Sequence, residues 1–576
     1  MTTQRRGQGR RAFAWVGGLC LLASVMLALV PCVGHGAPTV SAVLGFNQHL
    51  HEGSFAPMRA DVRGLPSPIR GRLILVQTLG SGWRGESTVT HELASGPIEN
   101  GTYAATVPFY DATNPVVLRL ITPDSQVIAE TQLDPRIGRH THRFAVSVGA
   151  EAPPVVDAVP AEPVSLSTDW WSYEGLSSLW VESPLPRAAW NAIGRWVYAG
   201  GRLVVFGGDN YLRMDTPVLR EILPLETPRL ISNGTGPAHL AGHLRSDSTV
   251  LREQNGTPLV IHRTLGAGTV TLITVSSRDM DENAYGPLLG LLQSATPIAL
   301  SRLAGDSLSA TSVTGPRHAT VGLLVVALLA CVSLGYALHR RQPRLAMVIV
   351  SLGIGFLAVL SGFYSFRTNQ NRPLYTCSYT LSLEGSFGSV RFGHAWYSLQ
   401  SMHLALENRQ AISEPKLHVQ PGADLDSYVT ETSLHETRLA LASLQMRTAD
   451  RYGIPASTIT LSVGEGWVEV DSTESETYDD AWLLQDGRVY SLPSIAPGVH
   501  RHVLGTGQPV DRAVELMGAA SAELAPLYGL LEETGIVFEG TWLLIASHRV
   551  VSQPSEEVAH SRSVILRAIP GGDHAA

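Results

Sequence analysis

Lysine and cysteine are scarce in this 576-residue chain. Lys416 is the only lysine, so nearly all of the positive charge is arginine. A lysine Schiff base or a P-loop lysine is therefore excluded almost everywhere. The formal net charge of −8 gives no basic field to attract nucleic acid, so we expect no nucleic-acid partner.

The cysteines exclude further chemistry. Cys20, Cys32 and Cys331 lie in long apolar runs, which leaves Cys377 alone in the polar parts of the chain. No intramolecular disulfide is expected there, and no C-x-x-C pair exists to bind zinc or to carry out redox chemistry. We expect no cofactor, and a fold that depends on packing alone.

Three apolar runs are long enough to indicate export or membrane segments. Residues 1–36 have arginines before an apolar stretch, which is typical of a secretory signal peptide that could also remain as an anchor. Residues 319–338 and 345–366 are each long enough to span the roughly 30 Å hydrocarbon layer. The arginine-rich connection 339–344 favours a cytoplasmic loop. The sequence therefore predicts a two-helix transmembrane hairpin in the bacterial inner membrane, with both large regions extracytoplasmic.

The remaining residues divide into three predicted domains and two linkers. Residues 37–150 contain short runs of alternating polar and apolar residues between turn signals, which predicts a β-sandwich. Residues 151–163 are rich in proline and predict a linker. Residues 164–300 predict an α/β domain, followed by a polar linker at 301–318. Residues 367–576 predict a mostly β C-terminal domain.

The stretch "GRWVYAGGRLVVFGGDN", residues 194–210, carries the α/β prediction. Apolar residues at helical spacing run from Ala189 to Val197, and Ser183 is a candidate helix cap. Gly200 and Gly201 can end a helix because glycine tolerates a left-handed backbone. The run "RLVVF" is typical of a parallel strand that is covered on both faces. Together with the apolar strand near Leu179, these features predict a right-handed βαβ unit.

The order of these parts, with "WNAIGRWVYAGGRLVVFGG" and "GTPLVIHRTLGAGTVTLI", resembles a group of poorly characterised bacterial membrane proteins. Their α/β part is similar to the class I glutamine amidotransferase fold, and the resemblance covers residues 40–366 best. Those enzymes need a nucleophilic cysteine with a histidine and an acid. Residues 164–300 contain no cysteine, and the chain has no G-x-S-x-G elbow. The resemblance therefore implies the fold without its chemistry.

Two acidic loops are weak candidates for ligand binding. "GGDN" follows the carboxyl end of a predicted parallel strand, where α/β sheets bind ligands, so either Asp209 contacts a ligand or the glycines only form a turn. In "SSRDMDEN", Asp279 and Asp281 could bind Mg²⁺ or Ca²⁺, or could belong to a solvated loop. We assign no catalytic residue and no metal ligands.

Histidines and tryptophans give two weaker signals. Three H-x-H pairs could each put two imidazoles on one side of a strand, within reach of one zinc ion, although no HExxH motif or third ligand accompanies them. A group of tryptophans could form a ligand platform or simply pack in the core. The pairs are His49/His51, His140/His142 and His500/His502, and the tryptophans are Trp170, Trp171, Trp190 and Trp196.

These features favour a non-catalytic, membrane-anchored extracytoplasmic protein of the bacterial envelope that binds a ligand or acts as a scaffold. Its expected partners are the membrane and other membrane or envelope proteins. One alternative is an envelope hydrolase or an amidotransferase-like enzyme whose site no motif reveals. Another is a structural subunit of a membrane transport or assembly complex.

Overall fold

The protein was analysed as a computed structural model of the whole chain. The structure describes residues 37–82, 85–110, 116–134, 139–140, 142–151, 156, 158–232, 237–280, 285, 336, 351, 374–385, 387–398, 402–407, 416–418, 428–433, 436–441, 445–455, 459–474, 477–478, 480–485, 488–509, 541–551 and 558–570. The predicted signal peptide at 1–36 lies outside these residues.

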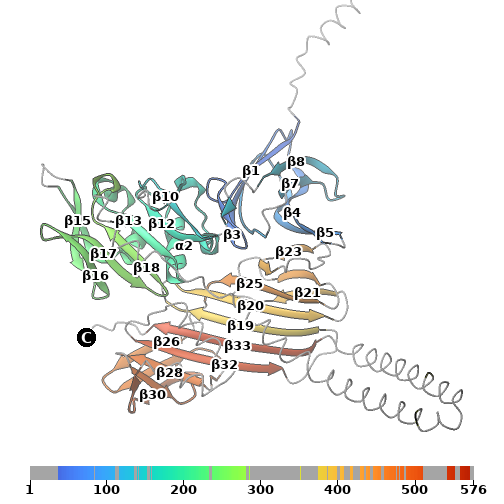
Figure 1. Cartoon of the computed structure of the whole chain (residues 1–576). Coiled ribbons are helices and arrows are strands. Elements are labelled where there is room, and N and C mark those ends of the chain that lie inside the picture. The colour runs from blue at the N-terminus through green and yellow to red at the C-terminus, as the bar shows by residue number, and fades with distance from the viewer. Residues whose placement is uncertain are drawn as a thin grey trace, which may run out of the picture.

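The N-terminal part is built mainly on two sheets whose strands here pair antiparallel and which share one core (Figure 1). Strand β3 shows why, because its even-numbered residues from Ala56 to Val62 are buried while Arg59 and Arg63 are exposed. Residues alternate between faces along a strand, so one face enters the core and the other faces outward. The first sheet is β1 (Thr39–Leu44), β3 (Phe55–Arg63) and β6 (Gly101–Pro108), and the second includes β4 (Ile69–Gly82), β5 (Gly85–Ile98), β7 (Val116–Ile121) and β8 (Val127–Leu133).

A seven-stranded sheet follows, in the order β11-β10-β12-β13-β18-β17-β16. Its first five strands are parallel, and β17 and β16 are antiparallel additions. The strand β10 belongs to this sheet, although its sequence pattern resembles that of the preceding sandwich strands. The strands are β10 (Phe144–Val148), β11 (Ala158–Pro160), β12 (Leu176–Val181), β13 (Arg202–Phe206), β16 (Ser248–Gln254), β17 (Thr257–Leu265) and β18 (Gly268–Ile273).

The βαβ unit that the sequence predicts is present as β12, α2 and β13, with β12 and β13 parallel. Helix α2 (Arg187–Tyr198) buries its apolar face, and Gly200 follows it at φ +117°. The predicted cap is wrong, because Pro186 occupies the N-cap position and no side chain caps the helix. The other short elements are η1 (Pro163–Ser165), η2 (Trp170–Tyr173), η3 (Gly208–Asn210), α3 (Tyr211–Met214), α4 (Pro217–Ile222), η4 (Ser277–Asp279), β14 (Leu225–Ile231) and β15 (His239–Leu244).

The C-terminal part is built on a nine-stranded sheet, in the order β22-β25-β20-β19-β33-β32-β28-β29-β31. Its two central strands, β19 (Leu374–Leu383) and β33 (Val558–Pro570), are parallel although they are far apart in the sequence. The others are β20 (Ser389–Ser398), β22 (Lys416–His418), β25 (Gln445–Gly453), β28 (Asp480–Gln485), β29 (Arg488–Leu492), β31 (Gln508–Pro509) and β32 (Trp542–Val551).

Two smaller sets of strands complete this part. Strands β26 (Ile459–Gly464), β27 (Trp467–Ser472) and β30 (Gly498–Val503) form a separate antiparallel sheet. Strands β21 (Met402–Glu407), β24 (Glu436–Leu441) and β23 (Tyr428–Ser433) extend the second sandwich sheet, because β23 pairs with β5. The N-terminal and C-terminal parts of the chain thus share a sheet.

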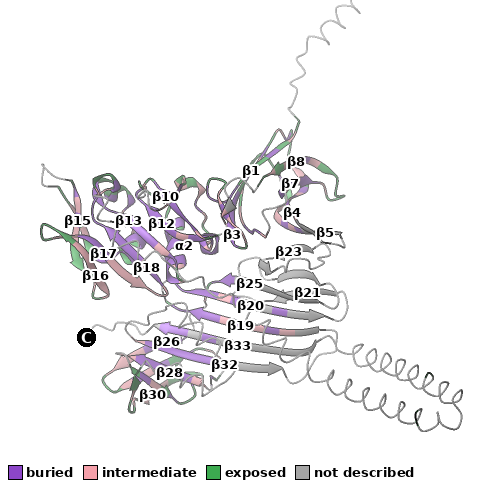
Figure 2. Ribbon diagram, viewed as in Figure 1, coloured by how far each residue is buried: buried purple, intermediate pink, exposed green. Residues whose placement is uncertain are grey.

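The three parts also share a hydrophobic core. Figure 2 shows buried residues in the α/β sheet and in the C-terminal strands β19, β32 and β33. Gly194 of α2 lies directly under the ring of Phe387, and the hydroxyl of Tyr198 donates to the carbonyl of Glu384 at 2.5 Å. Helix α2 is therefore covered by the C-terminal part.

The predicted fold class needs correction. The described residues are mostly strands, and their three α-helices are short. Within these residues, no helix has both the length and the apolar character needed to cross a bilayer. Residues 319–338 and 345–366 lie outside the described residues apart from the single positions 336 and 351. The two-helix transmembrane hairpin is thus not supported, and neither is the inner-membrane location that rests on it.

Candidate functional site

The carboxyl edge of the parallel sheet is where open α/β sheets bind ligands. Gly207 follows β13, and its N–H donates to the carbonyl of Ile273 at 2.7 Å. A Cβ atom on Gly207 would lie 2.5 Å from the carbonyl oxygen of Thr274. Gly208 has φ +69°, and a Cβ there would lie 2.8 Å from the amide nitrogen of Ser276. Tight backbone packing therefore accounts for both glycines.

The sequence-predicted ligand residues at this edge are exposed. Asp209 lies in η3 and Asp279 in η4, on the loops after β13 and β18, while Asp281 lies outside the described residues. Across the described part of the chain, no group of three histidine, cysteine or acidic side chains is arranged to hold a metal ion. The structure thus gives Asp209 and Asp279 no feature that distinguishes them from solvated loop residues.

Sequence reasoning missed a different carboxylate at this edge. Glu182 directly follows β12 and is only 3% exposed. It accepts hydrogen bonds from the hydroxyl of Ser276 at 2.5 Å, from the amide of Ser277 at 3.2 Å and from the Ser277 hydroxyl. The backbone N–H of Glu151 in turn donates to that hydroxyl at 2.9 Å. Glu182 therefore ties the loops after β10, β12 and β18 together.

The switch point of the sheet is also filled. Strand β11 pairs with one edge of β10, and the next strand, β12, pairs with its other edge. The strand order therefore reverses at β10, and a ligand crevice would be expected between β10 and β12. Gly149, directly after β10, has φ +71°, and a Cβ there would lie 1.9 Å from the hydroxyl of Ser183. Ser183, the predicted helix cap, instead closes this crevice.

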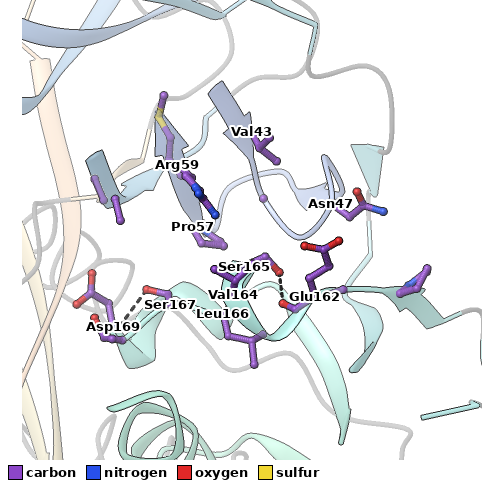
Figure 3. A pocket seen from close by; sticks show the side chains of 17 residues that line it. Val43, Asn47, Pro57, Arg59, Glu162, Val164, Ser165, Leu166, Ser167 and Asp169 are labelled. Atoms are coloured by element: carbon purple, nitrogen blue, oxygen red, sulfur yellow. Dashed lines mark hydrogen bonds between the residues drawn. The ribbon is translucent and has the colours of Figure 1, made fainter. Parts of the chain in front are cut away.

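A pocket of about 590 Å³ lies elsewhere, between the sandwich and the segment 160–169 (Figure 3). One wall is the outward face of the first sandwich sheet, where the strand register aligns Val43 with Arg59 and Arg59 with Ala104. Most of these outward residues are small or apolar, which leaves space against the opposite segment. The volume falls in the range of small-molecule sites, roughly 300–1,000 Å³, and such sites often lie between domains.

Polar groups line the opposite wall of this pocket. The amide of Asp169 donates to the hydroxyl of Ser167 at 3.0 Å, and that hydroxyl lies 3.1 Å from the hydroxyl of Thr106. Burial raises the pKa of Asp169, and a hydrogen bond with Thr106 partly offsets this effect. The hydroxyl of Tyr173 donates to the Ser167 carbonyl at 2.7 Å. Burial and the charge of Asp169 raise the pKa of that tyrosine.

The remaining polar side chains that line the pocket include several hydrogen-bond acceptors. Glu162 and Asn47 contribute side-chain oxygens, and the hydroxyl of Ser165 donates to the Glu162 carbonyl at 2.7 Å, so its oxygen can still accept. Arg59 is the only cation among the residues that line this pocket. An acidic residue with a raised pKa in a concave site marks a functional-site candidate. We therefore take this pocket as the candidate site.

The structure brings together histidines from two H-x-H pairs. His49 Nδ1 lies 2.9 Å from His140 Nε2, so the contact runs between pairs and not within one. His142 is exposed. In the third pair, the rings of His500 and His502 stack at 6.4 Å, and burial together with His500 lowers the pKa of His502. The four tryptophans considered as a ligand platform are buried in the core.

Comparisons with known proteins assign no family. No family model matches the chain, and no curated protein matches it. Cytoplasmic Protein STM1381 from Salmonella typhimurium LT2 is 12% identical, covers 38% of this chain and 90% of its own, and has a TM-score of 0.18. Cytoplasmic Protein STM3548 from Salmonella typhimurium is 12% identical, covers 36% of this chain and 85% of its own, and has the same TM-score. Such low scores support no inference, and the resemblance to the amidotransferase fold stays a prediction.

Proposed function

We propose that this protein is a non-catalytic binding protein whose ligand occupies the pocket between the sandwich and the segment 160–169. The observation that carries the proposal is the partly buried carboxylate of Asp169 in a pocket of ligand size. At the strand-end region, by contrast, Glu182 is occupied by hydrogen bonds and the glycine turns pack closely against neighbouring backbone.

The lining chemistry selects the ligand. Carboxylate, amide and hydroxyl oxygens are positioned to accept hydrogen bonds, whereas only Arg59 is a charged donor. Apolar atoms of Val43, Pro57 and Leu166 line the same space. We infer a small amphipathic ligand that carries amine or hydroxyl donors on an apolar body. Ionised Asp169 would bind an amine most strongly, because charge-assisted hydrogen bonds are roughly twice as strong as neutral ones.

The test begins with the unaltered full chain and a panel of monosaccharides, amino sugars and aliphatic amines. A ligand that raises the melting temperature is then measured by calorimetry against Ala104→Trp, which fills the pocket from an exposed position. We expect the affinity to fall by at least about tenfold, since tenfold corresponds to the loss of only about 1.4 kcal/mol. Thr102→Trp is the matched control, because Thr102 is exposed on the same face of β6 but does not line the pocket.

Two outcomes would contradict the proposal. Equal affinity of the ligand for both tryptophan variants would place its site elsewhere. Conversion of the bound compound by the unaltered protein, lost in Ala104→Trp and kept in Thr102→Trp, would show an enzyme where we propose a binding protein.

A further inference from the structure

The contact between His49 and His140 joins a tight turn to a short strand that is distant in the sequence. His49 Nδ1 and His140 Nε2 are 2.9 Å apart, and both side chains are partly buried. We propose that this histidine pair is a binding site for a divalent transition metal, with Cu²⁺ and Zn²⁺ as the ions it would take. Imidazole nitrogen suits both ions.

A constrained turn holds the first histidine. Asn47 and Gln48 both have positive φ, at 51° and 69°, between paired residues Phe46 and His49. The backbone N–H of each paired residue donates to the carbonyl of the other, at 2.8 and 2.9 Å. Positive φ is uncommon in residues other than glycine, and surrounding structure must maintain it. Gly45 supports the turn closely, because a Cβ there would lie 2.1 Å from the His49 carbonyl oxygen.

The second histidine is held by a strand and by a stacked ring. Strands β2 (Leu50–His51) and β9 (Arg139–His140) pair in parallel, which puts His140 beside the turn that carries His49. The ring of His140 also stacks on Phe144 with centroids 4.4 Å apart and an angle of 20° between planes. Both ligands are therefore positioned before any ion arrives, and such preorganisation lowers the entropic cost of binding.

The spacing of the nitrogens fits a shared ion. Zinc–imidazole bonds of about 2.0–2.1 Å at a tetrahedral angle put two nitrogens roughly 3.3 Å apart. The observed 2.9 Å needs to widen by only a few tenths of an ångström. In a neutral pair, the N–H of one ring donates a hydrogen bond to the bare nitrogen of the other. The ion binds once the donating ring has shifted its proton to its second nitrogen, which leaves both facing nitrogens as ligands. Both rings stay neutral, and no net proton is released.

Among the described residues, two imidazoles would be the whole protein contribution. No third histidine, cysteine or acidic residue joins them within the part of the chain that the structure describes. Water would fill the other coordination positions, and we expect an exchangeable ion instead of a permanent structural one. His49 and His140 do not line the pocket, so failure of this inference leaves the proposed function intact.

The experiment uses the full-length protein at pH 7.5, with Zn²⁺ followed by calorimetry and Cu²⁺ by electron paramagnetic resonance. We expect one preferred ion per chain and coupling of the first copper equivalent to two imidazole nitrogens. His49→Gln and His140→Gln should each weaken binding by at least about tenfold, since even loss of an outer-shell partner costs 10–100-fold.

Two matched variants control for other histidines. His142→Gln removes an exposed imidazole beside the site, and His500→Gln removes one of the stacked pair on β30, so both should leave the affinity within about twofold of the unaltered protein, because neither removes a proposed ligand. The proposal is overturned if the unaltered protein binds neither ion, if His49→Gln and His142→Gln bind equally, or if copper couples to fewer than two nitrogens. The last criterion needs no variant and holds even if a substitution prevents folding.

Discussion

The strand-end region of the α/β sheet and the pocket beside the sandwich present carboxylates in opposite ways. At the strand ends, Glu182 is buried and its oxygens are occupied by hydrogen bonds from two serines. In the pocket, Asp169 is partly buried and faces a space of about 590 Å³. The first carboxylate organises loops, whereas the second has room for a ligand.

The position of a site within a fold therefore does not decide its use. The switch point of a parallel sheet is where a ligand is expected, yet Gly149 and Ser183 fill it here. No ligand is expected on the outward face of a small antiparallel sheet, yet small residues such as Ala104 leave space there. Side-chain volume and hydrogen-bond occupancy decide between the two regions.

The largest expected effect tests whether Glu182 is structural. Glu182→Ala would leave the hydroxyls of Ser276 and Ser277 without their acceptor inside the protein. We expect the free energy of unfolding to fall by about 2–4 kcal/mol, measured by urea denaturation. Asp209→Ala removes an exposed carboxylate from the same edge and should change it by no more than about 0.5 kcal/mol. Equal losses in the two variants would contradict the distinction.

A second comparison, in which the expected difference between two variants is smaller, tests how tightly the strand-end turn is packed. Gly208→Ala and Gly256→Ala both force alanine into a left-handed backbone, at φ +69° and +74°. This strain costs roughly 1–2 kcal/mol at each position. Only Gly208 also has close neighbours, so its variant should lose about 1–3 kcal/mol more in the same urea titration. If the two losses are the same, the strand-end loops have room to adjust.

The local parts of this architecture could be predicted from the sequence. The helical spacing in residues 187–198 and the apolar run "RLVVF" predict α2 and β13. An element that buries a face has apolar residues at the spacing of that element. The pairing of β19 with β33 and of β23 with β5 could not be predicted. The pairing of distant strands depends on tertiary packing. The apolar pattern of each strand taken alone does not indicate its partner.

The candidate site shows the same limit. Asp209 and Glu182 both follow apolar strands, so their sequence signals are equivalent, and only burial separates them. Asp169 has no motif at all, because its pocket arises where a segment of the α/β part meets the outward face of another sheet. The contact between His49 and His140 likewise joins histidines 91 residues apart, whereas an H-x-H motif indicates only a contact within one pair.

The smallest expected effect tests the electrostatics of the pocket. Burial raises the pKa of Asp169 in the folded protein, so between its unfolded and folded pKa the folded state holds a proton that the unfolded state has lost. Stability from this group is therefore complete below the unfolded pKa of about 3.9 and is lost as the pH rises through the raised folded value.

Asp169→Asn removes this dependence, so the variant should gain stability relative to the unaltered protein as the pH rises from 3.5 to 7. Urea midpoints at several pH values measure the difference, and contributions from all other groups cancel in it. Glu162→Gln removes an exposed charge from the same pocket and should stay within about 0.5 kcal/mol throughout. A difference between Asp169→Asn and the unaltered protein that is constant with pH would mean that burial does not perturb Asp169. The pocket would then lose the feature that sets its carboxylate apart from the solvated acids at the strand ends.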